Sequence, residues 1–152
     1  MDLIEVHLIG LPVAAHSEAA QHSDEVMREF SHLAEGADPS HVPARLLALN
    51  QTLQQRYAAY TQATEDELSD AVDRGLDSVD LTFSVPPDAA EGARALGDLL
   101  DEVDEYCEAG EYLLTLKTPP AALAYRRWFL GEFVRQAAGE PPTPWPEWAA
   151  QQ

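Results

Sequence analysis

The sequence predicts an α+β fold that is predominantly helical, with about five helices and a small three-stranded sheet in the order β-α-α-α-β-α-β-α. Residues 3–9, 78–85 and 112–116 have the apolar pattern and length of strands, and longer segments between them repeat apolar residues at helical spacing. Glycine and proline separate these segments. A chain of 152 residues suits one domain. We therefore expect a single domain over residues 1–139 and a proline- and tryptophan-rich tail over residues 140–152.

The chain begins with the first expected strand and helix. Apolar and polar residues alternate in residues 3–9, as in a strand with one buried face, and Gly10-Leu11-Pro12 is expected to end it. A helix is expected over residues 15–34, because apolar residues recur at helical spacing and Gly36 follows them.

Two helices are expected between residues 40 and 75. Ser40 is a candidate N-cap, and a stripe of apolar residues at helical spacing follows it. The stripe consists of Val42, Leu46, Leu49, Leu53, Tyr57 and Tyr60. Thr64 and Glu67 have the spacing of a capping box, which predicts that a separate short helix starts there and stops at Gly75.

A βαβ unit is expected over residues 78–116. Apolar and polar residues alternate in residues 78–85, residues 88–109 form an amphipathic helix, and residues 112–116 form the third strand. Because a crossover of this kind joins parallel strands with a right-handed turn, the two strands are expected to be parallel. The helices are expected mostly on one side of the small sheet.

The last expected helix spans residues 119–138, with paired prolines in its first turn. Trp128 falls on the polar side of this helix, and two interpretations stay open. An exposed tryptophan beside tyrosine and arginine has the composition of a protein-binding hot spot. Alternatively the tail, which its prolines predict to be extended, folds back and covers Trp128 with Trp145 or Trp148. Arg126 lies on the apolar side, so we expect it to need a buried acidic partner.

The chain is strongly acidic, with 27 acidic against 9 basic side chains and a formal charge of −18. Residues 61–110 hold 15 of the acidic side chains and only two basic ones. Such a charge disfavours binding to nucleic acid and to anionic membranes. It either keeps the protein in solution or steers a partner protein with a basic surface.

Sequence motifs for catalysis or cofactor binding are absent. No phosphate-binding glycine loop, no Gly-x-Ser-x-Gly, no His-Glu-x-x-His and no Cys-x-x-Cys occurs, so we predict no cofactor and name no catalytic residue. Cys107, the only cysteine, lies on an apolar helical face and is expected to be a buried thiol, which favours a reducing cytoplasm. His22 has Glu18, Glu25 and Glu29 nearby, but without a ligand from a second helix we predict no metal site.

Two groups of side chains are candidates for protein binding. One is the aromatic and basic set on the last helix, and the other is the acidic face of the helix over residues 88–109. The candidate residues are Tyr125, Arg127, Trp128, Arg135, Asp98, Asp101, Glu102 and Glu105.

A resemblance adds a regulatory context. Residues 113–145, which begin Leu-Leu-Thr-Leu-Lys-Thr-Pro-Pro, and residues 42–49, Val-Pro-Ala-Arg-Leu-Leu-Ala-Leu, resemble small uncharacterised actinobacterial acidic proteins. Members of that group tend to be encoded beside anti-sigma regulatory kinases and their phosphatases. The chain lacks the Asn box and the Asp-x-Gly-x-Gly loop of the kinase, so the resemblance implies at most an accessory role in partner switching.

Two function classes follow from these observations. The first is a non-enzymatic cytoplasmic domain that binds another protein and acts as an accessory regulator in bacterial signalling. Homo-oligomerisation stays open. The alternative is a small-molecule-binding protein or an enzyme whose pocket, between sheet and helices, has no linear motif. A pocket lined by Arg126 or Arg127 favours the alternative, and a flat apolar patch around Trp128 favours the protein-binding domain.

Overall fold

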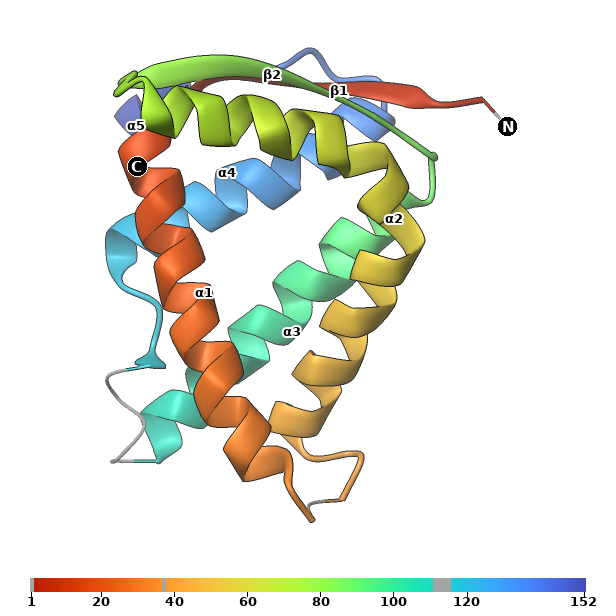
Figure 1. Cartoon of the computed structure of the whole chain (residues 1–152), viewed down its shortest axis with the longest axis vertical. Helices are drawn as coiled ribbons and strands as arrows, with labels where there is room; N and C mark the ends of the chain where they lie inside the picture. Colours follow the sequence, from red (N-terminus) through yellow and green to blue (C-terminus); the bar gives the residue numbers. More distant parts are fainter. Residues whose placement is uncertain (1, 37, 111–115) are drawn as a thin grey trace.

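Two strands that lie far apart in the sequence pair to form the sheet at one end of the molecule (Figure 1). The computed structural model describes residues 2–36, 38–110 and 116–152. Strand β1 (Ile4–Pro12) pairs antiparallel with β2 (Ser78–Val85), so that Ile4 lies opposite Val85 and Pro12 opposite Ser78. Both segments alternate apolar and polar side chains, and this lets the two strands present one shared apolar face to the helices.

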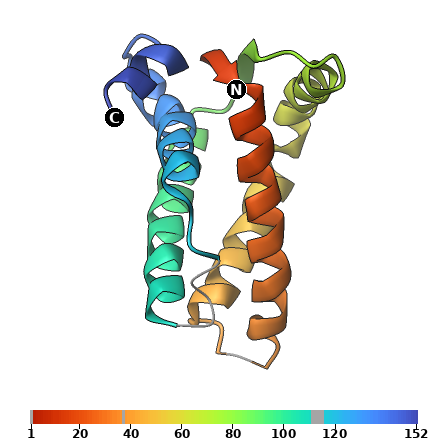
Figure 2. The same cartoon turned by 90° about the vertical axis from the view of Figure 1, so that its left-hand side faces the viewer.

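The helices follow the order that the sequence indicates, except in the middle of the chain and in the tail. They are α1 (Val13–Ala34), α2 (Val42–Asp73), α3 (Ala89–Ala109), α4 (Pro120–Ala137) and α5 (Trp145–Ala150). Figure 2 shows that α1 and α2 lie side by side, opposite the pair formed by α3 and α4. Among the residues that the structure describes, no helix combines the length and the apolar composition that a membrane span requires.

The three-stranded sheet and the βαβ unit predicted from the sequence are wrong. Within the described residues the sheet has two strands, and β2 pairs with β1 rather than with a parallel neighbour. Residues 112–115 of the predicted third strand lie outside the described residues, and Leu116 lies in a short 3-10 turn. The mostly helical α+β class itself agrees with the prediction.

Side chains from two helices occupy the outer edges of the sheet. His7 and Thr82 lie opposite each other. The His7 N–H donates to Gln136 Oε1 and the Gln136 amide donates back to the His7 carbonyl, both at 2.8 Å. On the other edge the Thr64 hydroxyl donates to the Thr82 carbonyl at 3.2 Å. At this level of the sheet, groups that a third strand would bond already have partners.

Strand β1 continues through the segment that the sequence predicted to end it. Leu8 lies opposite Leu81 and Leu11 opposite Val79, so β1 carries one extra residue between these pairs. Gly10 sits in this bulge with a φ of +68°, which favours glycine. Its N–H donates to the Asp80 carboxylate at 2.7 Å, an interaction that keeps the bulged strand attached to β2.

Helix α2 is continuous where the sequence predicted a restart. Figure 1 shows that α2 changes direction midway, so that its C-terminal half runs along the sheet. Thr64 is buried inside this helix instead of capping a new one. The reason is that Thr64, Leu68 and Ala71 continue the helical stripe of apolar or buried positions against the sheet. Burial of a continuous face outweighs the local capping signal.

The core has two parts, one beneath the sheet and one among the helices away from it. The part beneath the sheet includes Val6, Leu8, Leu11, Leu81, Phe83, Val85, Ala89, Ala93, Tyr125, Trp128 and Phe133. The part among the helices includes Val26, Phe30, Leu46, Leu99, Val103, Cys107 and Leu116. Between the two parts lies a cavity.

Candidate ligand-binding cavity

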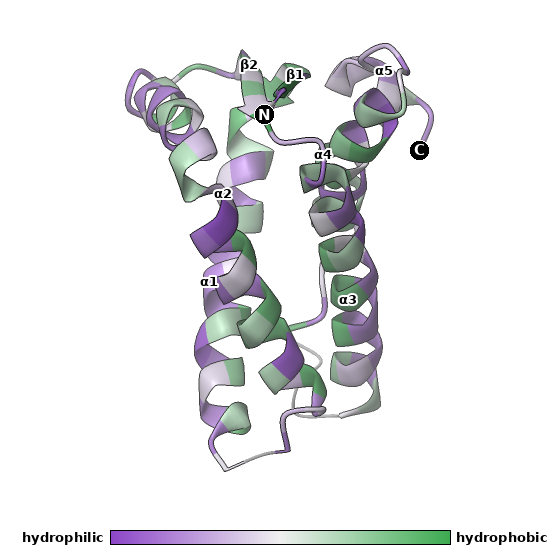
Figure 3. Ribbon diagram, turned by 90° about the vertical axis from the view of Figure 1, so that its right-hand side faces the viewer, coloured by the Kyte–Doolittle hydropathy of each residue, from purple (hydrophilic) through white to green (hydrophobic). Residues whose placement is uncertain are grey.

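A cavity of about 250 Å³, here called the central cavity, lies between α1, α3 and α4. Helix α2 contributes Leu46 to its wall, and the segment before α4 contributes Leu116. Its apolar lining residues are Ala19, Ala20, Val26, Met27, Leu46, Leu96, Leu100, Val103, Leu116, Ala122, Phe129 and Leu130. Figure 3 shows apolar residues on the sides of α1 and α3 that face each other across the interior. The volume exceeds the roughly 150 Å³ of an apolar cavity that holds benzene.

Polar side chains reach this cavity from three places in the chain. His16, His22 and Ser23 come from α1, Thr118 from the turn before α4, and Tyr125 and Arg126 from α4. The Nε2 atom of His22 is buried and has no hydrogen-bond partner among the described residues. A buried polar atom without a partner costs about 1–3 kcal/mol.

The positive charge of Arg126 at the cavity wall is already compensated. Its guanidinium donates to Asp101 at 2.7 Å and to Asp104 at 3.3 Å, and a third bond goes to the Thr118 hydroxyl. The Arg126 side chain is 13% exposed and that of Asp104 is 14% exposed. The expectation that Arg126 needs a buried acidic partner is therefore confirmed. An arginine held by two carboxylates offers little attraction to a further anion.

His16 and Tyr125 form the second polar pair of the cavity. The His16 Nδ1 atom and the Tyr125 hydroxyl share a hydrogen bond of 2.6 Å. Burial lowers the pKa of His16 below its usual value, and burial raises the pKa of Tyr125 far above its usual value. Both groups are therefore uncharged near neutral pH. The pair adds hydrogen-bonding capacity to the wall without adding charge.

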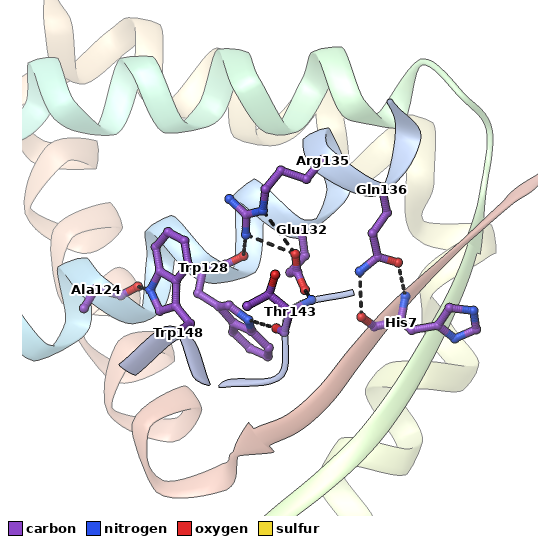
Figure 4. Close-up of polar contacts among 8 residues, drawn as sticks. All are labelled: His7, Ala124, Trp128, Glu132, Arg135, Gln136, Thr143 and Trp148. Carbon is purple, nitrogen blue, oxygen red and sulfur yellow. Dashed lines mark hydrogen bonds and ion pairs between the residues drawn. The ribbon is translucent and has the colours of Figure 1, made fainter. Parts of the chain in front are cut away.

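Trp128 lies under the tail, which decides between the two interpretations left open by the sequence. Its side chain is 0% exposed, and its indole N–H donates to the Thr143 carbonyl at 2.7 Å (Figure 4). The Trp145 ring packs against Trp128 with 5.5 Å between ring centroids. Covering by the tail is therefore confirmed. Part of the prediction is wrong, because Trp145–Ala150 is the short helix α5 rather than an extended segment.

Glu132 holds the tail onto α4. Its carboxylate is 0% exposed and accepts the Thr143 N–H at 2.7 Å and two Arg135 donors at 3.1 and 3.3 Å. Figure 4 shows Arg135 between Glu132 and Trp148, and the guanidinium carbon lies 4.8 Å from the Trp148 ring centroid. Charge-assisted hydrogen bonds of this kind are stronger than neutral ones. The buried carboxylate thus orders the chain after α4.

The predicted protein-binding residues divide into buried and exposed groups. Tyr125 and Trp128 are buried, and Arg135 is committed to Glu132. Asp101 and Glu102 are exposed but form ion pairs with Arg126 and Arg45. The exposed members that form no ion pair with a described residue are Asp98, Glu105 and Arg127. The eight residues therefore do not form one surface.

Neither Cys107 nor His22 lies in a reactive or metal-binding arrangement among the described residues. Cys107 is fully buried, as expected, and burial with the nearby Asp104 raises the pKa of its thiol to about 11. A thiol with that pKa is a poor nucleophile at neutral pH. No group of three or more His, Cys, Asp or Glu side chains among the described residues could hold a metal ion. His22 with its flanking glutamates therefore gains no further ligand from these residues.

The sequence did not indicate the central cavity. It also did not indicate that Gln136 bonds the edge of the sheet or that Glu132 holds the tail. His16 and His22 line the cavity from α1, but they are six residues apart, which is not a spacing that indicates a ligand site. The sequence does mark Glu132 as unusual, because it is an acidic residue within the mostly apolar and basic sequence of the last helix. Comparison with known proteins adds no assignment: no protein family, curated protein or solved structure matches the chain.

Proposed function

We propose that the protein binds a small, mostly apolar molecule with one neutral hydrogen-bonding group in the central cavity. The observation that carries this proposal is the mainly apolar cavity of about 250 Å³, whose wall also includes His22, Thr118 and the His16–Tyr125 pair. Ligand sites in proteins share this combination of an apolar lining and a few polar groups. It is the small-molecule alternative that the sequence left open, although that alternative placed the pocket between sheet and helices and this cavity is lined by helices.

The charges around the cavity favour a neutral ligand over an anion. Arg126 is paired with Asp101 and Asp104, and His16 is uncharged because burial lowers its pKa. The net charge of −18 adds a general repulsion of anions. A hydroxyl, carbonyl or amide group would therefore bond His22 without the desolvation cost of a carboxylate.

The test is binding of n-hexanol to the wild-type protein and to a variant with a smaller cavity. Ala19 lines the cavity, so Ala19→Leu fills part of it. We expect n-hexanol to raise the Tm of the wild type, as any ligand of the folded state does, and to bind Ala19→Leu more than tenfold more weakly.

The matched control is Ala95→Leu on the exposed face of α3, which should bind n-hexanol like the wild type. Equal affinity of the wild type and Ala19→Leu, or no saturable binding to either, contradicts the proposal.

A second proposal, binding of a partner protein, rests on a smaller surface than the sequence indicated. Asp98, Glu105 and Arg127 stay exposed without an ion pair to a described residue. The accessory regulatory role that the resemblance implies belongs to this proposal. For a partner isolated by pull-down from the native host, the association rate should fall markedly as salt rises from about 0.05 to 0.5 M. An association rate indifferent to salt contradicts steering by these charges.

A further inference from the structure

We propose that the ligand of the central cavity is a molecule with a linear apolar chain, which passes the Phe129 ring into two neighbouring hollows that open to the surface. This inference rests on the proposed function. It adds the shape of the ligand, which the central cavity alone does not determine.

Two further hollows adjoin the central cavity. One, between α2, α3 and α4, has a volume of about 440 Å³ and is here called the α2–α3 hollow. The other, between α1, α2, α4 and β2, has a volume of about 450 Å³ and is here called the α1–α2 hollow. Both have mainly apolar walls, so a methylene chain in either would leave water for an apolar surface.

Shared residues show that these spaces adjoin one another. Phe129 lines the central cavity and both hollows. Leu96 and Leu130 are common to the central cavity and the α2–α3 hollow, and His16 is common to the central cavity and the α1–α2 hollow. The side chains of these shared residues therefore lie between the central cavity and the two hollows. A narrow chain can pass where one ring turns aside, whereas a compact polycyclic ligand cannot.

The polar groups set the direction of such a ligand. His22 and Thr118 line the central cavity but neither of the two hollows. The neutral polar end would bond His22, and the apolar chain would extend away from it past Phe129. The chain would follow the apolar part of the hollow walls, which also contain the polar residues Thr61 and Glu65.

The experiment is a titration with the homologous series from n-butanol to n-dodecanol. Burial of one methylene group contributes about 0.8 kcal/mol, which equals about a fourfold gain in affinity for each added carbon. We expect this gain to continue along the series in the wild type and to stop at a shorter chain in Phe129→Trp. Phe129→Leu removes part of the ring between these spaces and should increase the affinity for the long alcohols more than the affinity for n-butanol.

Tyr60→Trp is the matched control, because Tyr60 is exposed on α2 and lines none of these spaces. Phe129→Leu gives an independent result if Phe129→Trp fails to fold. If the gain stops at the same chain length in all folded variants, the ligand is confined to the central cavity. The inference is then wrong while the proposed function stands. If no alcohol binds at all, the proposed function is wrong as well.

Discussion

Substitution of Glu132 tests how the tail is held. This carboxylate is 0% exposed, and its oxygens accept one backbone donor from Thr143 and two donors from Arg135. In Glu132→Gln the amide oxygen can replace one carboxylate oxygen, but the amide NH₂ then faces donors on the other side. The expected loss in the free energy of unfolding is about 1–3 kcal/mol. Glu132→Ala leaves Arg135 without its counter-charge and should lose about 3–5 kcal/mol.

These losses are large relative to the stability of an ordinary domain, about 5–15 kcal/mol. For a chain of this size, a loss of about 2 kcal/mol lowers the Tm by roughly 4–8 °C. The assay is urea unfolding followed by circular dichroism, with limited proteolysis of the tail as a second readout. Glu105→Gln on the exposed face of α3 is the control and should change stability by less than about 0.5 kcal/mol. If Glu132→Gln loses no more than Glu105→Gln, the buried carboxylate does not hold the tail.

Three further predictions concern pH, the sheet edge and metal. Because burial lowers the pKa of His16 below 6.5, the unfolded chain binds a proton that the folded chain rejects, so stability should fall as the pH drops below about 6.5. His16→Gln should flatten this dependence in urea unfolding, and curves of equal slope would contradict the assignment. Gln136→Leu leaves two backbone groups of His7 without partners and should lower the free energy of unfolding by about 1–3 kcal/mol. We also expect the exposed strand edge to cause concentration-dependent association in sedimentation. A stable monomer would show that the edge needs no cover. Purified protein should hold no stoichiometric transition metal by elemental analysis, and one zinc ion per chain would contradict the interpretation of His22.

The parts of the fold that the sequence predicts are those set by local periodicity. Strand β2 and helices α1, α3 and α4 lie within two residues of their expected bounds, because one face of each segment is apolar throughout. Pairing of strands is a long-range property that periodicity does not contain. The alternation in β2 is equally compatible with a parallel neighbour and with β1, and only packing of the whole chain selects β1.

The candidate site was harder to predict than the fold for the same reason. The sequence marks Arg126 as a buried cation, and this is confirmed by its pairing with Asp104. It also marks Trp128 as an unusual aromatic residue, but its two interpretations could be separated only by the path of the tail. Nothing in the spacing of His22 shows that the facing helices leave a space beside it, because a cavity depends on the volumes of residues from several elements.

The most direct test of the central claim is a methyl NMR titration of the wild-type protein with n-hexanol. Val26, Leu100 and Val103 line the central cavity from two helices, whereas Leu76 is exposed beyond the end of α2. We predict saturable chemical-shift changes with one common Kd at the three cavity residues and none at Leu76. Shifts of similar size at Leu76, or no saturable shift at the cavity residues, would contradict the claim that the central cavity is a ligand site.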